Sequence, residues 1–188
     1  MKKNILLAIC LILSTIAYSQ CKIKTKGSIL KAYEKRVPID IDLMTKPKIL
    51  FDKYMTVAVS TFAKTTDGNY YLIIPFTRAY SVRFEANQDT PIIFYLEDGD
   101  QVSLNPTEDI DGKMFVTKYN IFLFYKITRE QIGKLATNNI VSLRIYFIAE
   151  KEIANSYEDD LGRYLEYEIL SENNRTNIFD AANCILQN

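Results

Sequence analysis

Apolar and polar residues alternate along much of this chain, and a period of two is the pattern of β-strands buried on one face. The alternation starts near Met55 and is strongest from Ile140 to Ala149. Together with continuous apolar runs, it predicts strands over residues 55–60, 69–76, 80–86, 92–96, 101–104, 114–127, 140–149 and 165–169, and shorter ones around 39–43 and 48–51. Residues 150–160 are polar without alternation, which predicts a loop.

Three Asp-Gly pairs punctuate these strands: Asp67-Gly68, Asp98-Gly99 and Asp111-Gly112. Asp-Gly between two β-rich runs is a strong hairpin signal, because glycine accepts the positive φ that a tight turn requires. The first two pairs therefore predict hairpins that end near Phe76 and Leu104. The third precedes the long run that ends at Ile127.

Two segments depart from the strand period. Thr128 and Gln131 have the spacing of a capping box, in which each residue satisfies a backbone amide of the other. A short helix is expected after Thr128, with Ile132 and Leu135 facing inward. Residues 174–187 predict a C-terminal helix with Ile178, Ala182 and Ile185 on one side.

The run from Tyr119 to Lys126 is apolar on both faces, with Ile121 and Leu123 on one and Phe122 and Phe124 on the other. Such a strand needs cover on both sides. We expect a mainly β fold (β-rich α+β), an antiparallel sandwich or open barrel of about eight to ten strands with two short helices. With no linker or repeat, residues 20–188 are expected to form a single domain.

The first nineteen residues have the three parts of a secretory leader. Lys2 and Lys3 precede an apolar core from Ile5 to Ala17, and Ala17-Tyr18-Ser19 offers small residues to signal peptidase. The core is shorter than the roughly 20 residues of a membrane span. We expect a signal peptide over residues 1–19, cleavage after Ser19, and a periplasmic or secreted protein without a membrane span.

Cleavage would remove Cys10 and leave Cys21 and Cys184. Lipidation of Cys21 requires a small residue before it and an aliphatic one three before it, but Gln20 and Tyr18 occupy those places, so we expect no lipid anchor. In an oxidising compartment a Cys21–Cys184 disulfide is plausible and would close nearly the whole chain. The alternative is a buried free Cys184 and a mobile Cys21.

The composition removes several function classes. The chain has 23 basic and 23 acidic residues, 13 Tyr and 10 Phe, but no His and no Trp. Without histidine there is no Ser-His-Asp triad, no Cys-His pair and no HExxH zinc site. We expect no cofactor, no metal and no nucleic-acid partner. The acidic stretches 108–112 and 158–160 could form a loose calcium site, although turn acids need no ligand to explain them.

Two residue pairs remain as candidate sites. Glu166 and Glu168 share one strand face, about 6.5–7 Å apart at Cα by strand rise, which is near the spacing of glycosidase carboxylates. The simpler interpretation is the solvated side of an edge strand. Arg144 and Tyr146 share the face opposite the apolar one, where Arg144 is either a structurally paired arginine or part of a polar-aromatic surface patch.

The leading hypothesis is an exported, non-catalytic binding domain with a protein partner, a class that includes inhibitor and immunity-like proteins. The alternative is a carboxylate-dependent hydrolase of cell-envelope or extracellular glycans that uses Glu166 and Glu168. A purely structural domain is the third hypothesis that the residues leave open.

Overall fold

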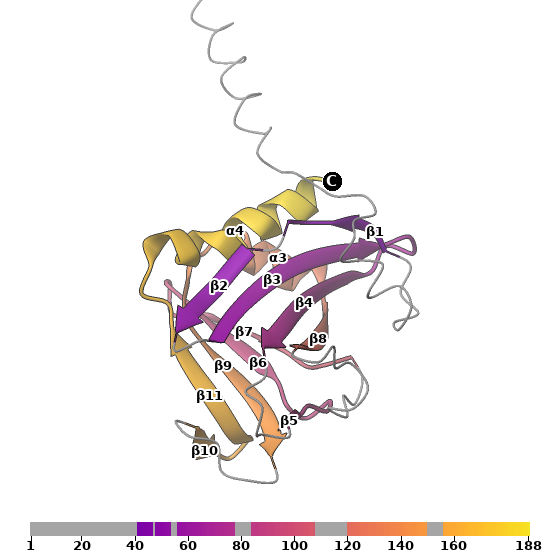
Figure 1. The fold of residues 1–188 in the computed structure, drawn as a ribbon. Helices are drawn as coiled ribbons and strands as arrows, with labels where there is room; N and C mark the ends of the chain where they lie inside the picture. The colour runs from indigo at the N-terminus through magenta and orange to yellow at the C-terminus, as the bar shows by residue number, and fades with distance from the viewer. Residues whose placement is uncertain (1–40, 47, 54–55, 78–83, 108–119, 150–155) are drawn as a thin grey trace, which may run out of the picture.

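The computed structural model of the chain describes residues 41–46, 48–53, 56–77, 84–107, 120–149 and 156–188. These residues form eleven strands and two helices, labelled α3 and α4. The pairing between strands is antiparallel throughout both sheets. The described part of the chain is therefore a mainly β fold of two sheets with a C-terminal helix, as the alternation predicted (Figure 1).

The first sheet has the order β1-β3-β4-β8. β2 pairs with the first half of β3, and β1 pairs with its last residues, on the same edge. Its strands are β1 (Ile41–Met44), β2 (Lys48–Lys53), β3 (Thr56–Thr65), β4 (Tyr70–Thr77) and β8 (Asn120–Ile127).

The second sheet has the order β10-β11-β9-β6-β7, and β5 pairs with the end of β9. Its strands are β5 (Phe84–Glu85), β6 (Ile92–Leu96), β7 (Gln101–Leu104), β9 (Ile140–Ala149), β10 (Tyr157–Asp159) and β11 (Gly162–Glu168).

The first two predicted hairpins are present as β3–β4 and β6–β7. Gly68 has φ 84° and Gly99 has φ 90°, so each uses the backbone freedom that the Asp-Gly signal implied. The bounds of β6, β7 and β9 match the predicted ranges. The third pair, Asp111-Gly112, and the predicted leader over residues 1–19 lie outside the described residues.

The predicted loop over residues 150–160 is wrong at its end, where β10 pairs with β11 in a short hairpin. All three residues of β10 are exposed, so no alternation marks the strand in the sequence. The pairing depends instead on a tight turn in which Gly162 has φ 116° and the amide of Leu161 donates to the Asp159 carboxylate.

Helix α3 (Arg129–Leu135) begins at Thr128 with the predicted capping box. Gln131 N–H donates to Thr128 Oγ1, and the Thr128 amide donates to Gln131 Oε1. Helix α4 (Glu172–Gln187) is longer than predicted by about half a turn at its start. No helix within the described ranges is long and apolar enough to cross a membrane.

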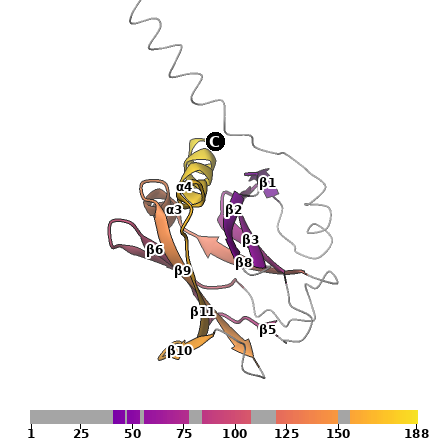
Figure 2. The ribbon, with the colours of Figure 1, turned by 60° about the vertical axis from the view of Figure 1, so that its left-hand side comes forward.

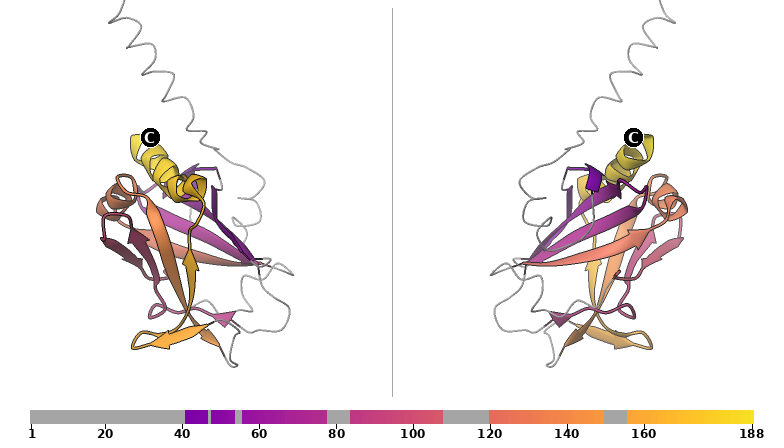
Figure 3. Two further views of the ribbon diagram at one scale, coloured as in Figure 1. Left: turned by 90° about the vertical axis from the view of Figure 1, so that its left-hand side faces the viewer. Right: turned by 90° about the vertical axis from the view of Figure 1, so that its right-hand side faces the viewer.

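The main core lies between the two sheets and is closed at one end by the helices (Figures 2 and 3). The first sheet contributes Phe62 and Leu72, and the second contributes Phe94 and Leu143. Helix α4 packs on β2, β3, β9 and α3, and its predicted apolar stripe is fully buried. The members of that stripe are Ile178, Ala182 and Ile185.

The two-sided strand prediction for β8 is confirmed where its side chains are described. Leu123 belongs to the main core, whereas Phe124 belongs to a second buried cluster on the other face, with Met44, Ala63 and Ile73. Burial on both faces explains why this segment lacks alternation.

Tyr125 of β8 is fully buried in the main core, and its hydroxyl has no hydrogen-bond partner among the described residues. A buried hydroxyl without a partner costs about 1–3 kcal/mol. We therefore expect Tyr125→Phe to raise the free energy of unfolding by about 1 kcal/mol, measured by urea denaturation. An equal or lower stability of the phenylalanine variant would contradict this packing.

Candidate functional site

The outer face of the second sheet, which points away from the main core, carries three side-chain rows across its strands. One row is Tyr157, Tyr164 and Tyr146, on β10, β11 and β9. The next is Glu166, Arg144 and Ile93. The third is Glu168, Ser142 and Tyr95. We call this surface the tyrosine face; it comprises these nine residues and Asp159, which follows Tyr157 by two positions on β10.

Arg144 lies at the centre of the tyrosine face. Its guanidinium carbon is 4.7 Å from the ring centroid of Tyr164 and 5.4 Å from that of Tyr95. Stacking on two rings stabilises a cation through the negative faces of the rings. The side chain is also only about one quarter exposed, at 28%. Arg144 is thus held in place by aromatic side chains.

Two carboxylates balance the charge of Arg144. Its Nη1 lies 3.6 Å from Asp159 Oδ2, and its Nε lies 3.5 Å from Glu166 Oε1. The Nε atom is buried and makes no hydrogen bond, so the contact with Glu166 is ionic attraction without hydrogen-bond alignment. Burial lowers the pKa of Arg144, but Tyr146 and the Glu166 charge outweigh burial and raise the pKa. The guanidinium stays charged at every working pH.

Asp159 also orders the aromatic row. Tyr146 Oη donates to Asp159 Oδ2 at 2.7 Å. The ring of Tyr146 lies 5.1 Å from that of Tyr164, and the ring of Tyr157 stacks on Tyr164 at 5.7 Å. Such pairs add about 0.5–1.5 kcal/mol each beyond the buried area. The row is therefore rigid at β9 and reaches the surface at β10.

Large apolar side chains become exposed around this row. Tyr157 and Leu161 are each 57% exposed, and Ile148, two residues beyond Tyr146 on β9, is 45% exposed. Three of the four exposed large hydrophobic residues in the described part of the chain thus lie on the tyrosine face or beside it; the fourth is Leu170. A concentration of this kind on a protein surface needs an explanation.

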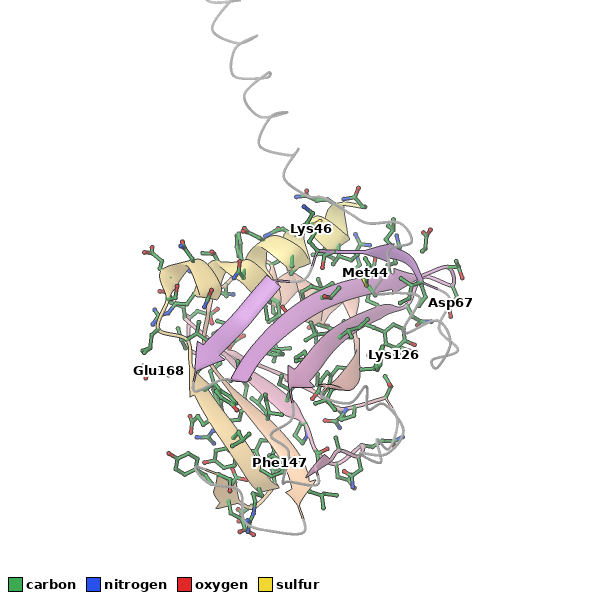
Figure 4. All side chains as sticks on the ribbon, in the orientation of Figure 1. Met44, Lys46, Asp67, Lys126, Phe147 and Glu168 are labelled. Carbon is green, nitrogen blue, oxygen red and sulfur yellow. The ribbon has the colours of Figure 1, made fainter. Side chains whose placement is uncertain are left out.

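Arg144 is ion-paired, which is one of the two alternatives expected for it. Tyr146 is only 1% exposed and is buried with Tyr164 and Ile93, so it does not lie on an exposed patch. Glu166 and Glu168 lie on the same face and are exposed, with Glu166 engaged by Arg144. Figure 4 shows Glu168 at the side of the molecule opposite Asp67. A cleft of about 930 Å³ lies on that other side, between the β3–β4 turn, the end of β7 and the β8–α3 junction, and neither glutamate lines it.

Cys184 is buried on α4 and is not a free thiol. Cys21 lies outside the described residues, so the Cys21–Cys184 bridge stays a prediction. The acidic stretch 108–112 also lies outside them. Within the described ranges, no three His, Cys, Asp or Glu side chains are grouped to hold a metal ion. In the stretch 158–160, Glu158 pairs with Arg163 at 3.4 Å.

The sequence interpretation missed the residues that surround Arg144. Tyr95, Tyr157 and Tyr164 come from strands whose order could not be read from the chain, and Asp159 was assigned to a loop. A usable signal was present on β9 and β11, because Tyr146 and Tyr164 both occupy positions that alternate with core residues. An aromatic residue on the predicted wet face of a strand is the sign of a covered or binding surface.

Burial and the hydrogen bond to Asp159 raise the pKa of Tyr146 to about 12. An unfolded tyrosine loses its proton near pH 10, so the folded chain binds more protons above that pH and stability falls. The contribution is complete below about pH 10 and is lost as the pH rises to about 12. We expect wild type to lose more stability than Tyr146→Phe between about pH 9 and about pH 11 in urea denaturation. Equal losses would contradict the assignment.

No family model matches the chain, and no significant match was found among curated proteins or solved structures.

Proposed function

We propose that this protein is an exported, non-catalytic binding domain that docks a protein partner on the tyrosine face. The observation that carries the proposal is the rigid row of stacked tyrosines that ends in exposed Tyr157 beside Leu161. Tyrosine and arginine are the residues most often found at the energetic centres of protein interfaces. Inhibitor and immunity-like proteins belong to this class.

Pre-organisation supports the same proposal. Aromatic rings contribute large contact areas with few rotatable bonds, and less entropy is lost on binding when they are already stacked. Here Tyr164 is held between Tyr146 and Tyr157, and Arg144 is packed over its ring. Tyr146 and Tyr164 are only 1% and 8% exposed, so they support Tyr157, which is the ring of this row that a partner would contact.

The charges of the face indicate the chemistry of the partner. Asp159, Glu166 and Glu168 are acidic, whereas Arg144 is the single basic residue among the ten that define the face. The excess of carboxylates favours a partner with basic side chains around an apolar centre. Association is expected to slow as salt is added, because rim charges act mainly on the on-rate.

The hydrolase hypothesis has no specific observation in its favour. Its two glutamates lie on the exposed sheet face, and Glu166 forms part of the charge balance of Arg144. Glycosidase carboxylates act from the two sides of a bound sugar, which requires a second acid across a cleft. The protein-binding proposal accounts for the tyrosines and for the acids together.

The test is capture from a cell-envelope extract by immobilised mature protein. We expect one protein to be retained by wild type and by Lys134→Ala, and to be lost with Tyr157→Ala. Lys134 lies on α3, where it pairs with Asp100, and both variants change exposed side chains. Retention of the same proteins by all three baits would contradict the proposal.

A further inference from the structure

A cleft of about 930 Å³ lies on another part of the molecule, where the β3–β4 turn, the end of β7 and the β8–α3 junction meet. Its walls include Asn69, Tyr70, Asn105, Lys126 and Arg129. Ligand pockets usually measure ~300–1,000 Å³. Figure 4 shows Lys126 and Asp67 at this side of the molecule, away from Glu168.

Among the described residues, no carboxylate pairs with the cations of this cleft. The Lys126 side chain is exposed and makes no ion pair or hydrogen bond with another described side chain. Arg129 is also exposed, and its Nη1 donates to Tyr70 Oη at 3.5 Å, which is the long limit for a hydrogen bond. By contrast, Lys134, Arg144 and Arg163 all pair with acids. Two unpaired cations in one cleft give it an uncompensated positive charge.

One acid that adjoins the cleft, Asp67, is engaged by its own turn. None of the described lining residues is acidic. Asp67 adjoins the lining at Gly68, where its carboxylate accepts hydrogen bonds from the Thr65 hydroxyl and the Asn69 amide. These hydrogen bonds lower the pKa of Asp67, so its carboxylate stays ionised and its oxygen atoms are bound to residues of the turn. An anion entering the cleft would not have to displace it.

The remaining walls indicate the kind of anion. Ser103, Tyr70 and Asn105 offer hydroxyl and amide groups, whereas the apolar lining residues Leu104 and Ile127 are each only 2% exposed. A peptide would find few apolar anchors there. The volume also exceeds what an inorganic ion requires. Hydroxyl and amide groups beside separated cations suit a chain of hydroxyl-rich units that carry carboxylates.

We propose that this cleft binds an acidic oligosaccharide, with Arg129 and Lys126 contacting successive uronate carboxylates. The guanidinium of Arg129 can donate two parallel N–H groups to one carboxylate. Lys126 lies three residues earlier, about 10 Å or less away at Cα, and supplies a point charge for the next carboxylate. The proposal is independent of the protein-docking role of the tyrosine face. Its ligand would be found among acidic glycans of the cell envelope or its surroundings.

The experiment is calorimetric titration of the mature protein with a short oligogalacturonate. We expect Lys126→Gln and Arg129→Gln each to weaken binding about tenfold or more, and Lys134→Gln to leave it unchanged. Arg129→Lys should fall between wild type and Arg129→Gln, because it keeps the charge and loses the planar fork. All three positions are exposed, and circular dichroism is the check that each variant is folded.

Two comparison ligands make the result decisive. A neutral galacto-oligosaccharide of the same length should bind at least about tenfold more weakly, and an oligoglutamate should also bind more weakly than the uronate. Equal binding of either ligand, equal weakening by Lys134→Gln, or no binding of the uronate would overturn the proposal.

Discussion

Replacement of Phe62 by alanine is expected to lower the free energy of unfolding by about 3–5 kcal/mol. Phe62 is fully buried in the main core, opposite Leu72 on the neighbouring strand, and its amide donates to Thr45 Oγ1 at 2.9 Å. This hydrogen bond to the Thr45 side chain holds the strand at Phe62, which limits how far the site can collapse around the cavity that the substitution leaves. Because domains are typically stable by only 5–15 kcal/mol, this is a large share of the total.

Urea denaturation measures this loss, and Leu170→Ala is the control. Leu170 is 73% exposed, so its truncation should change stability by less than about 0.5 kcal/mol. Similar losses for both variants would show that Phe62 does not lie between two packed sheets.

Replacement of Arg144 by alanine is expected to weaken binding of the captured protein partner by about thirtyfold, which corresponds to about 2 kcal/mol. Without the guanidinium, Tyr95 and Tyr164 lose the group between them, and Asp159 and Glu166 repel each other at the centre of the face. The loss of folding stability should be smaller, about 1 kcal/mol, because the ion pairs are partly exposed and screened. Biolayer interferometry measures the affinity.

Arg163→Ala is the matched control for this variant. Arg163 is on β11 with a side chain 29% exposed, close to the 28% of Arg144, and it pairs with Glu158. Arg163 neighbours Tyr164 along the strand, so its side chain belongs to the other face of the sheet. Its removal takes away the same charge and should leave the affinity within about threefold. If both variants bound alike, the tyrosine face would not be the docking surface.

Most strands of the fold were predictable because their chemistry is local. The hairpin turns depend on Gly68 and Gly99, and α3 begins at a capping box contained in four residues. β10 could not be predicted, since three exposed residues carry no periodicity and the strand exists through its pairing with β11. Strand order was also inaccessible, because it depends on contacts between residues far apart in the chain.

The candidate site was predictable only in part, for the same reason. Arg144 and Tyr146 were identified on one strand, where alternation places them opposite the core. Their partners come from three other strands, and the rows that bring Tyr164 and Tyr95 to Arg144 require the order β11-β9-β6. The cleft beside Arg129 is formed by three segments that are far apart in the chain, and no pattern in the sequence indicates that they meet.

The most direct test of the docking proposal is a photoreactive phenylalanine analogue placed at Tyr157 in the cell that produces the protein. Tyr157 is exposed at the edge of the tyrosine face, so the analogue should leave the fold intact. We expect irradiation to join one partner protein to the chain from position 157 and not from the control position Lys134. No adduct at position 157, or the same adduct from both positions, would contradict the account.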